Sequence, residues 1–328
     1  TILKERKRVI INFLIIIQDN MATKDEILDS IDKNYDIIFP CITDLENDIS
    51  NLLDSAGVFY RIFSRRKKIT SIKKKVENKA EIKYIPEESK MQDIIGFRIV
   101  LYYADDVDVC IELLRSIFKV NNFERDQLDT ATFKPCRTNY VFDIPEESSM
   151  RLPQQISNDC YIDNTFEVQI RTIFSEGWHE VEHDIRYKFR EDWENQMGLS
   201  RELNGLFAVL EICEHDIISI CDKFAYENYK CGNWEAMIRN KYRLRFQERG
   251  LQAGLEEYLN QNKEIAKRIF RFKREKLIKI LWETKLPINY DNIVYVVNFF
   301  EAKDATIQKL TPKIVLKKLE KCREDAEN

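Results

Sequence analysis

The chain has 328 residues and a formal net charge of −4, from 52 Lys and Arg against 56 Asp and Glu. This balance excludes a uniformly basic nucleic-acid-binding protein but leaves room for a local cationic site. A hydrophobic content of 44% can build a sizeable core, and only 8 Gly and 7 Pro favour long helices with few tight turns.

The first sixty residues are expected to form helices. The basic residues from Lys4 to Arg8 and the apolar run 9–17 are together similar to the start of a signal peptide. No small-residue cleavage site follows, so we interpret this part as a buried helix within an N-terminal helical segment, residues 1–33. No CxxC pair occurs among the 8 cysteines, and no apolar run is long enough to span a bilayer. We therefore expect reduced thiols in a cytoplasmic protein that does not enter membranes.

A densely basic segment follows, with ten Lys or Arg between Arg61 and Lys83. The usual meaning of such a run is a solvated helix face. From Arg65 to Lys75, however, the segment also offers cations and the Ser71 hydroxyl over about two helical turns. Such a set of donors suits the binding of a triphosphate. No Gly-rich loop accompanies it, so the segment is not a P-loop.

Strands and helices are expected to alternate after residue 93. The sequence predicts strands over 94–103, 140–144 and 166–171, and helices over 107–118 and 173–188. This order predicts an α/β core, in which the long apolar run 94–103 is a central strand.

Beyond residue 200 the periodicity is almost entirely helical. We place a boundary near residue 230, between a domain over 34–230 and a C-terminal helical accessory domain over 231–328. We expect residues 234–328 to be dispensable for the core fold, because their charge density indicates a regulatory or partner-binding surface.

Two acidic residues lie on or beside the predicted strands. Asp93 leads into the strand over 94–103, and Glu167 lies on the polar face of the strand over 166–171. Mg²⁺ commonly uses one or two carboxylates together with substrate phosphates, so both residues are candidate metal ligands. Arg98 is the only charge within a long apolar strand. Because a buried guanidinium is costly unless it is paired or stacked, we expect it to have a functional role.

Four motifs in this order resemble the synthetase domain of the RelA/SpoT family, and most of all its small alarmone synthetases. They are Arg65-x-Lys67 with Ser71-Ile72 and Lys75, Asp93-Ile94-x-Gly96-x-Arg98, Glu167-x-Gln169-Ile170-Arg171-Thr172, and Trp178 with Glu182-His183 and Tyr187-Lys188. The resemblance implies a nucleotidyltransferase-like mixed β-sheet flanked by helices. It also implies transfer of the β,γ-diphosphate of ATP to the 3′-hydroxyl of an acceptor nucleotide, as in alarmone synthesis during the stringent response.

Carried over position by position, the resemblance assigns three groups of residues. Arg65 and Arg98 would stack on the adenine of ATP, and Lys67, Ser71 and Lys75 would hold its phosphates. Asp93 and Glu167 would be the catalytic residues and the Mg²⁺ ligands, and Glu167 would also activate the acceptor hydroxyl. The acceptor would contact Lys134, Cys136, Arg137, Tyr140, Gln169 and Arg171.

One loop departs from the family pattern Gly-Tyr-x-Ser-x-His, whose tyrosine stacks on the acceptor base. The best counterpart here runs from Pro135 to Tyr140, with Cys136 in the place of the tyrosine and Tyr140 in the place of the histidine. Losing a stacked aromatic ring forfeits roughly 1–3 kcal/mol. The acceptor base therefore stays open, and we expect GTP and GDP to be poor acceptors.

The helix over 173–188 has two further interpretations. His179 and His183 match the HExxH pattern of zinc hydrolases, although Arg186 stands where the extended pattern requires Gly. In a purely structural interpretation, Phe174, Trp178, Val181 and Ile185 form the core-facing side of this helix.

Three functions follow from the sequence. The first is an active pyrophosphokinase that makes an alarmone-like nucleotide. The second is a toxin-like pyrophosphotransferase acting on tRNA, in stress or phage defence, which the altered loop and the aromatic and basic residues of 229–286 favour. The third is a catalytically silent nucleotide-binding regulator. A homo-oligomer, and a regulator bound by the C-terminal helices, are further interpretations that the sequence leaves open.

Overall fold

The computed structural model of the chain describes residues 25, 28–29, 32, 39–78, 91–126, 138–146, 163–247 and 249–327. The expected N-terminal helical segment over 1–33 therefore lies almost wholly outside the described residues. None of the described helices is both long and apolar enough to cross a membrane.

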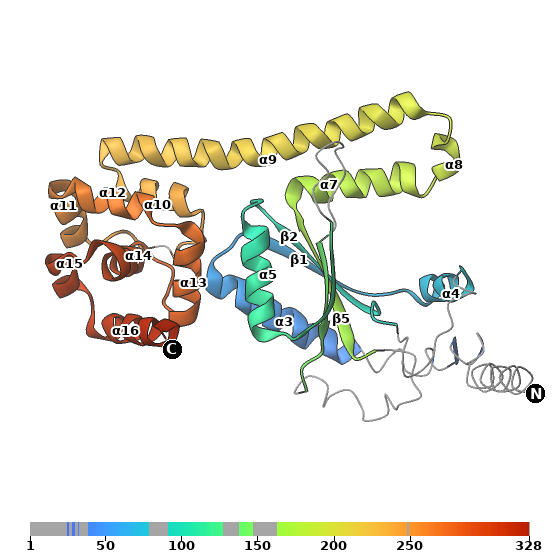
Figure 1. Cartoon of the computed structure of the whole chain (residues 1–328), viewed down its shortest axis with the longest axis horizontal. Helices are drawn as coiled ribbons and strands as arrows, with labels where there is room; N and C mark the ends of the chain where they lie inside the picture. Colours follow the sequence, from blue (N-terminus) through green and yellow to red (C-terminus); the bar gives the residue numbers. More distant parts are fainter. Residues whose placement is uncertain are drawn as a thin grey trace, which may run out of the picture.

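A five-stranded mixed sheet lies next to the C-terminal helices (Figure 1). Its strands are β1 (Tyr60–Arg66), β2 (Ile95–Leu101), β3 (Val120–Arg125), β4 (Thr138–Asp143) and β5 (Thr165–Thr172). Their order is β1-β2-β5-β4-β3, in which β2 and β5 are parallel and the other neighbours are antiparallel. Together with the helices that flank it, this mixed sheet confirms the predicted fold class.

The two faces of the sheet differ in chemistry. Phe97 and Phe166 are buried on the face covered by α3 (Phe39–Ala56) and α5 (Asp106–Ile117). Burying a large apolar side chain contributes about 1.5–3 kcal/mol, so this face supplies the core of the domain. Because successive side chains on a strand alternate between faces, Glu167 lies on the opposite face. The polar residues of the predicted strands therefore gather on the side away from α3 and α5.

The basic segment begins as a strand, β1, and not as the solvated helix face that such a run usually indicates. Tyr60 is buried while Arg61 and Arg65 are exposed, which is the alternation of a strand at the edge of a sheet. Helix α4 (Ile69–Asn78) begins only after this strand. Arg65 therefore belongs to the sheet, whereas Ser71 belongs to α4. The edge strand β3 was not predicted either.

The helix expected over 173–188 begins where it was predicted but changes its form. Thr172 caps α7 (Ile173–Glu182), because its side chain accepts a hydrogen bond from the Ser175 N–H and the Ser175 hydroxyl accepts one from the Thr172 N–H. The chain continues as a π-helix over His183–Tyr187 and a short helix α8 over Arg190–Trp193. π-Helical turns often occur at functional sites.

A long helix connects the sheet region to the C-terminal helices. This helix, α9 (Met197–Cys231), ends at Gly232, whose φ of 76° is the left-handed conformation that terminates helices. The elements that follow are α10 (Trp234–Tyr242), α11 (Ala253–Gln261), α12 (Lys263–Arg271), α13 (Arg274–Thr284), α14 (Tyr290–Val297), a π-helix (Asn298–Ala302), α15 (Ala305–Leu310) and α16 (Lys313–Glu327).

These C-terminal helices pack against the sheet domain. Helix α13 contacts α3, and the buried apolar residues of the two parts form one continuous cluster. Two buried ion pairs cross the same contact, Arg243 with Asp105 and Arg274 with Asp106. The boundary near residue 230 stays a prediction. The expectation that residues 234–328 are dispensable does not agree with these contacts, because their removal would expose the paired carboxylates and part of the core.

Candidate active site

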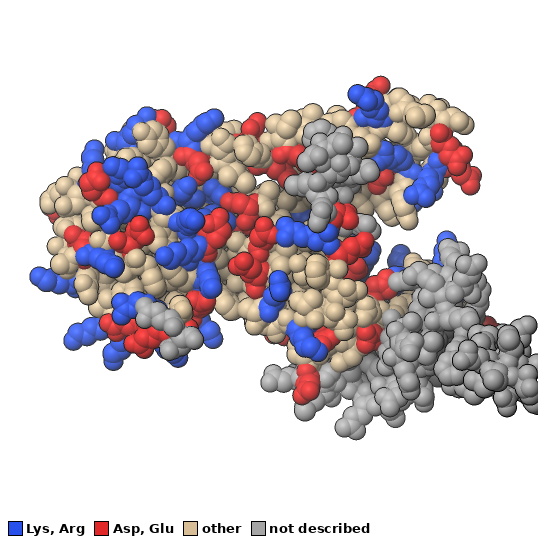
Figure 2. Space-filling view, viewed as in Figure 1, with Lys and Arg blue, Asp and Glu red and all other residues tan. Residues whose placement is uncertain are grey.

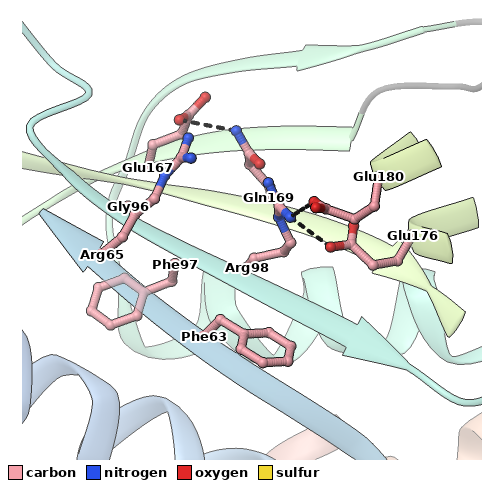
Figure 3. A pocket seen from close by; sticks show the side chains of 9 residues that line it. All are labelled: Phe63, Arg65, Gly96, Phe97, Arg98, Glu167, Gln169, Glu176 and Glu180. Atoms are coloured by element: carbon pink, nitrogen blue, oxygen red, sulfur yellow. Dashed lines mark hydrogen bonds and ion pairs between the residues drawn. The ribbon is translucent and has the colours of Figure 1, made fainter. Parts of the chain in front are cut away.

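Three neighbouring strands bring the candidate residues into one row. Arg65 on β1 lies opposite Gly96 on β2, and Gly96 lies opposite Glu167 on β5. Gly96 has no side chain, and a Cβ placed there would be in ordinary contact with the Arg65 side chain, at 3.7 Å. The side chains of Arg65 and Glu167 approach each other across this glycine (Figure 3).

A cavity of about 390 Å³ opens beside this row. The predicted residues Arg65, Arg98, Glu167 and Gln169 line it, together with Phe63, whose ring is 54% exposed. This size and mixture of apolar and charged groups suit a small-molecule ligand. The structure thus brings together two predicted donor-binding arginines and one predicted catalytic carboxylate.

Arg98 is held in place from helix α7. One of its terminal nitrogens, Nη1, donates to Oε1 of Glu176 at 2.6 Å and also to Glu180 (Figure 3). Burial alone would lower the pKa of Arg98, but the hydrogen bonds and charges of these two carboxylates outweigh burial and raise it. The guanidinium is therefore charged and fixed beside the cavity, as stacking on a planar ligand requires.

The surroundings of Glu167 disfavour the charged form of its carboxyl group. Burial is the main cause that raises its pKa above the ordinary value, and the charge of Asp93 raises it further. A hydrogen bond of 3.3 Å from Gln169 Nε2 and the charges of Lys67 and Arg65 offset only part of this effect. Two carboxylates that repel each other in this way would be stabilised by a cation between them.

Lys67 joins the end of β1 to the start of β2. Its ammonium group forms an ion pair with Asp93, and its backbone N–H donates to the Ile94 carbonyl at 2.8 Å. A cation from the basic segment is therefore held beside a predicted metal ligand.

A second cavity, of about 650 Å³, adjoins the first. It shares Arg98 and Gln169 with the first cavity and continues past Arg171 and His179 to Lys188. Burial, followed by the charges of Arg171 and Arg98, lowers the pKa of His179 to about 4, so its imidazole is neutral at pH 7. Two cavities that meet at Arg98 and Gln169 can hold two reactants side by side.

The structure locates only some of the remaining predicted residues. Ser71 is exposed on α4, and Lys75 is also on α4 but its side chain lies outside the described residues, as do Lys134, Cys136 and Arg137.

Tyr140 does not fit the acceptor role predicted for it. Its side chain is 5% exposed, pairs in register with Val168, and stacks on Phe142 with ring centroids 5.8 Å apart. It therefore lies on the helix-covered face, opposite to Glu167.

Residues 64–192 match the family model described as "Region found in RelA / SpoT proteins". The chain carries a RelA/SpoT region. All four motifs recognised in the sequence fall within the matched residues, so the resemblance based on them is confirmed.

Individual proteins are similar to this chain in sequence or in structure. GTP pyrophosphokinase YjbM from Bacillus subtilis (strain 168) is 29% identical over 132 residues, which are 39% of this chain and 56% of YjbM. The chain thus spans about half the length of the curated relative it matches. Small alarmone synthetase 1 from Bacillus subtilis has a TM-score of 0.44 and 21% identity, covering 58% of this chain and 96% of that one. A GTP pyrophosphokinase family protein from Streptococcus pneumoniae has a TM-score of 0.44 and 17% identity, covering 58% and 91%.

Two residues of the RelA/SpoT region that position Arg98 were missed in the sequence. Glu176 and Glu180 are four residues apart on α7 and therefore share one face of that helix. The sequence did contain a signal for them, because an arginine within an apolar strand needs carboxylate partners. The helix that follows β5 carries such carboxylates four residues apart.

The last of the four motifs begins with a residue that has a structural role. Trp178 is buried, its ring lies 5.0 Å from that of Phe207 on α9, and its indole N–H donates to the Leu203 carbonyl at 3.3 Å. Val181 and Ile185 are about half exposed, so the core-facing side expected for this helix is only partly buried.

The zinc-hydrolase interpretation of His179 and His183 gains no support. Their ring centroids are 5.8 Å apart, and His183 stacks on Tyr187 at 5.3 Å. Within the described part of the chain, no group of three His, Cys, Asp or Glu side chains is arranged to hold a metal ion.

Proposed function

We propose that the RelA/SpoT region of this chain is an ATP-dependent pyrophosphokinase, which transfers the β,γ-diphosphate of ATP to the 3′-hydroxyl of an acceptor nucleotide. One observation carries the proposal. A single cavity joins Arg65 and Arg98 to Glu167, with the Lys67–Asp93 pair beside it and a second cavity adjoining it. The name of YjbM, a GTP pyrophosphokinase, supports the same reaction class.

In this proposal ATP occupies the first cavity. Its adenine stacks on the Arg98 guanidinium, which Glu176 and Glu180 hold in place, and on Arg65 from the neighbouring strand. Its phosphates extend toward Lys67 and α4, where Ser71 and Lys75 are assigned to the same role. Phosphoryl-type transfer depends mostly on such positioning and charge neutralisation.

The donor set of Asp93 and Glu167 fits Mg²⁺. Both offer carboxylate oxygens, and the repulsion that raises the pKa of Glu167 is the kind that a bound cation relieves. Two protein ligands, with phosphate oxygens and water completing the shell, are typical of Mg²⁺ at phosphate-transfer sites. When bound, the ion would neutralise charge on the transferred group.

The proposed reaction moves the diphosphate from one oxygen to another. The acceptor hydroxyl oxygen attacks the β-phosphorus of ATP, the bond from that phosphorus to the oxygen bridging to the α-phosphate breaks, and AMP leaves with that oxygen. Glu167 takes the hydroxyl proton, a role for which its carboxylate is placed at the wall of the first cavity. Lys67 and the neighbouring cations stabilise the developing negative charge.

A transfer assay tests this function directly. The protein is incubated with γ-labelled ATP, Mg²⁺ and, in separate reactions, each free nucleotide or bulk tRNA. Label that appears on a nucleotide supports the proposal. Label on RNA would favour the toxin-like alternative instead, and no transfer to any acceptor would favour a silent nucleotide-binding regulator.

Arg98→Ala is expected to weaken ATP binding more than Arg66→Ala does. Arg98 lines the cavity, whereas Arg66 lies next to Arg65 on the strand and so points to the opposite face. A desolvated cation–π contact is worth up to about 2 kcal/mol, so the difference should approach thirtyfold in Kd by isothermal titration calorimetry. Equal losses in the two variants would remove Arg98 from the ATP site.

Cys136→Tyr is expected to lower the KM for GDP as acceptor, starting from poor use of GDP by the unaltered chain. Tyr140 is turned to the other face of the sheet, so it does not replace the missing platform. Restoring base stacking is worth roughly 1–3 kcal/mol, or about 5- to 150-fold in affinity. Efficient use of GDP by the unaltered chain would show that another group already supplies the platform.

A further inference from the structure

A third cavity lies where the C-terminal helices meet the sheet domain, away from the two cavities described above. This joint cavity measures about 500 Å³, within the range of small-molecule sites. Its wall combines Phe59 and Tyr103 of the sheet domain with Arg239, Arg243, Arg245 and Phe246 of the C-terminal part. Both parts of the chain are therefore needed to form it.

The joint cavity has a basic wall. Three arginines line it, and none of its described lining residues is acidic. Arg243 pairs with Asp105 and Arg245 with Asp54, and neither aspartate lines the cavity. Figure 2 shows Lys and Arg side chains over the C-terminal helices, interspersed with Asp and Glu. Guanidinium groups that converge on a concave wall are suited to phosphate oxygens, which they can bind in pairs.

Arg243 is the most deeply buried of the three arginines. Its side chain is only 4% exposed, and its terminal nitrogen Nη2 pairs with Asp105. Its Nε–H has no hydrogen-bond partner among the described residues. A buried donor of this kind is rarely left unsatisfied in a folded protein. Arg243 also lines the joint cavity, so its guanidinium adds positive charge to that wall.

The aromatic residues of the joint cavity offer flat surfaces. Phe246 stacks on Tyr290 with ring centroids 4.6 Å apart and an angle of 11° between the rings. Arg239 donates to the Tyr290 hydroxyl at 3.1 Å, which fixes this pair beside the cationic wall. Arg245 lies over the ring of Phe59, at 5.6 Å from its centroid. Stacked rings next to arginines suit a ligand that has both a planar base and phosphates.

We propose that the joint cavity is a second nucleotide-binding site, which takes a nucleoside polyphosphate with its phosphates on Arg239, Arg243 and Arg245 and its base on the aromatic wall. This inference goes beyond the proposed function, since none of these residues lines the catalytic cavities. The two sites are joined by β1 and β2, because Tyr60 pairs with Leu101 at one end of these strands and Arg65 with Gly96 at the other. Five residues of strand separate them, or about 17 Å.

The test uses the full chain in an Arg98→Ala background, in which ATP binding at the catalytic cavity is weakened. Isothermal titration calorimetry with ATP is expected to show a residual saturable site, close to one per chain. Adding Arg239→Gln should weaken this residual site about tenfold, the effect of losing one charge-assisted contact. Arg271→Gln is the matched control, because Arg271 is an exposed arginine at the end of α12 that does not line the joint cavity.

Two further measurements separate the base from the phosphates. Phe246→Leu should lower the affinity for ATP but leave the affinity for inorganic triphosphate unchanged. A thermal melt of each variant shows that the fold is intact. Absence of residual binding in the Arg98→Ala chain, or residual binding that Arg239→Gln leaves unchanged, would overturn the proposal. Equal affinity for ATP and inorganic triphosphate would contradict its nucleotide part.

Discussion

Glu167→Gln is expected to lower the rate of diphosphate transfer by about 10²- to 10⁴-fold, the range for removing a positioned general base. The substitution keeps the shape of the side chain but removes its charge and its ability to take a proton. ATP binding should change little, because Arg65 and Arg98 remain. Asp93→Asn is expected to have a comparable effect, since it removes the other predicted metal ligand and the partner of Lys67.

Glu167→Gln is expected to stabilise the folded chain, although it lowers the rate of transfer. Because the pKa of Glu167 is raised in the folded chain, its contribution to stability is present at low pH, when it is protonated, and is lost as the pH rises through that pKa. At pH 7 and without metal, Glu167→Gln should therefore melt above the unaltered chain. The difference should shrink as the pH falls, because the glutamate is then protonated in the folded and the unfolded chain alike. A loss of transfer together with a gain in melting temperature separates a functional role from simple unfolding.

Glu112→Gln provides the matched control for these measurements. Glu112 is exposed on α5, on the covered side of the sheet, and should change neither rate nor melting temperature measurably. Near-normal turnover in Glu167→Gln or Asp93→Asn would remove that residue from the reaction.

Much of the site could be predicted from the sequence, because its residues lie on strands with a clear pattern of apolar and charged residues. A single arginine in the apolar run 94–103 pointed to Arg98, and strict alternation around Glu167 placed that residue on a polar face. Both line the same cavity in the structure, on one face of the sheet. Local period and charge are sufficient for such inferences, since each depends only on neighbouring residues.

The errors came from features that depend on distant partners. Strand β1 was hidden by its cations, and only its pairing with β2 shows that Arg61 and Arg65 alternate with buried residues. The face of Tyr140 is set by the register of β4 on β5, where a shift of one residue reverses every side chain. Periodicity likewise cannot show that the C-terminal helices pack on α5, because Arg274 and Asp106 are far apart in sequence.

Arg274→Met is expected to destabilise the whole chain by about 3–5 kcal/mol, the usual cost of leaving one partner of a buried ion pair unpaired. Asp106 is fully buried, and the Arg274 side chain, 5% exposed, approaches it to 2.5 Å. Arg274 Nε also donates to the Tyr242 carbonyl at 2.7 Å, so the substitution removes a second contact. Urea unfolding monitored by circular dichroism measures the change.

The pH dependence of this variant tests the mechanism. Burial raises the pKa of Asp106, and the charge and hydrogen bond of Arg274 oppose that rise. Without Arg274 the pKa should rise further, so folding favours the protonated acid. The defect of Arg274→Met should therefore be smaller at pH 5 than at pH 8. Arg274→Met with Asp106→Leu should recover much of the loss, because replacing both partners of a buried pair by apolar groups is often neutral.

Lys279→Met on the same helix is the control. Lys279 is 68% exposed and lies 3.9 Å from Glu283, so its loss should change the free energy of unfolding by less than about 0.5 kcal/mol. If Arg274→Met were as stable as this control, the ion pair would not hold the C-terminal helices to the sheet domain. If instead the variant unfolds in two separate transitions, the pair is what makes the two parts unfold together, since small domains otherwise unfold as independent units.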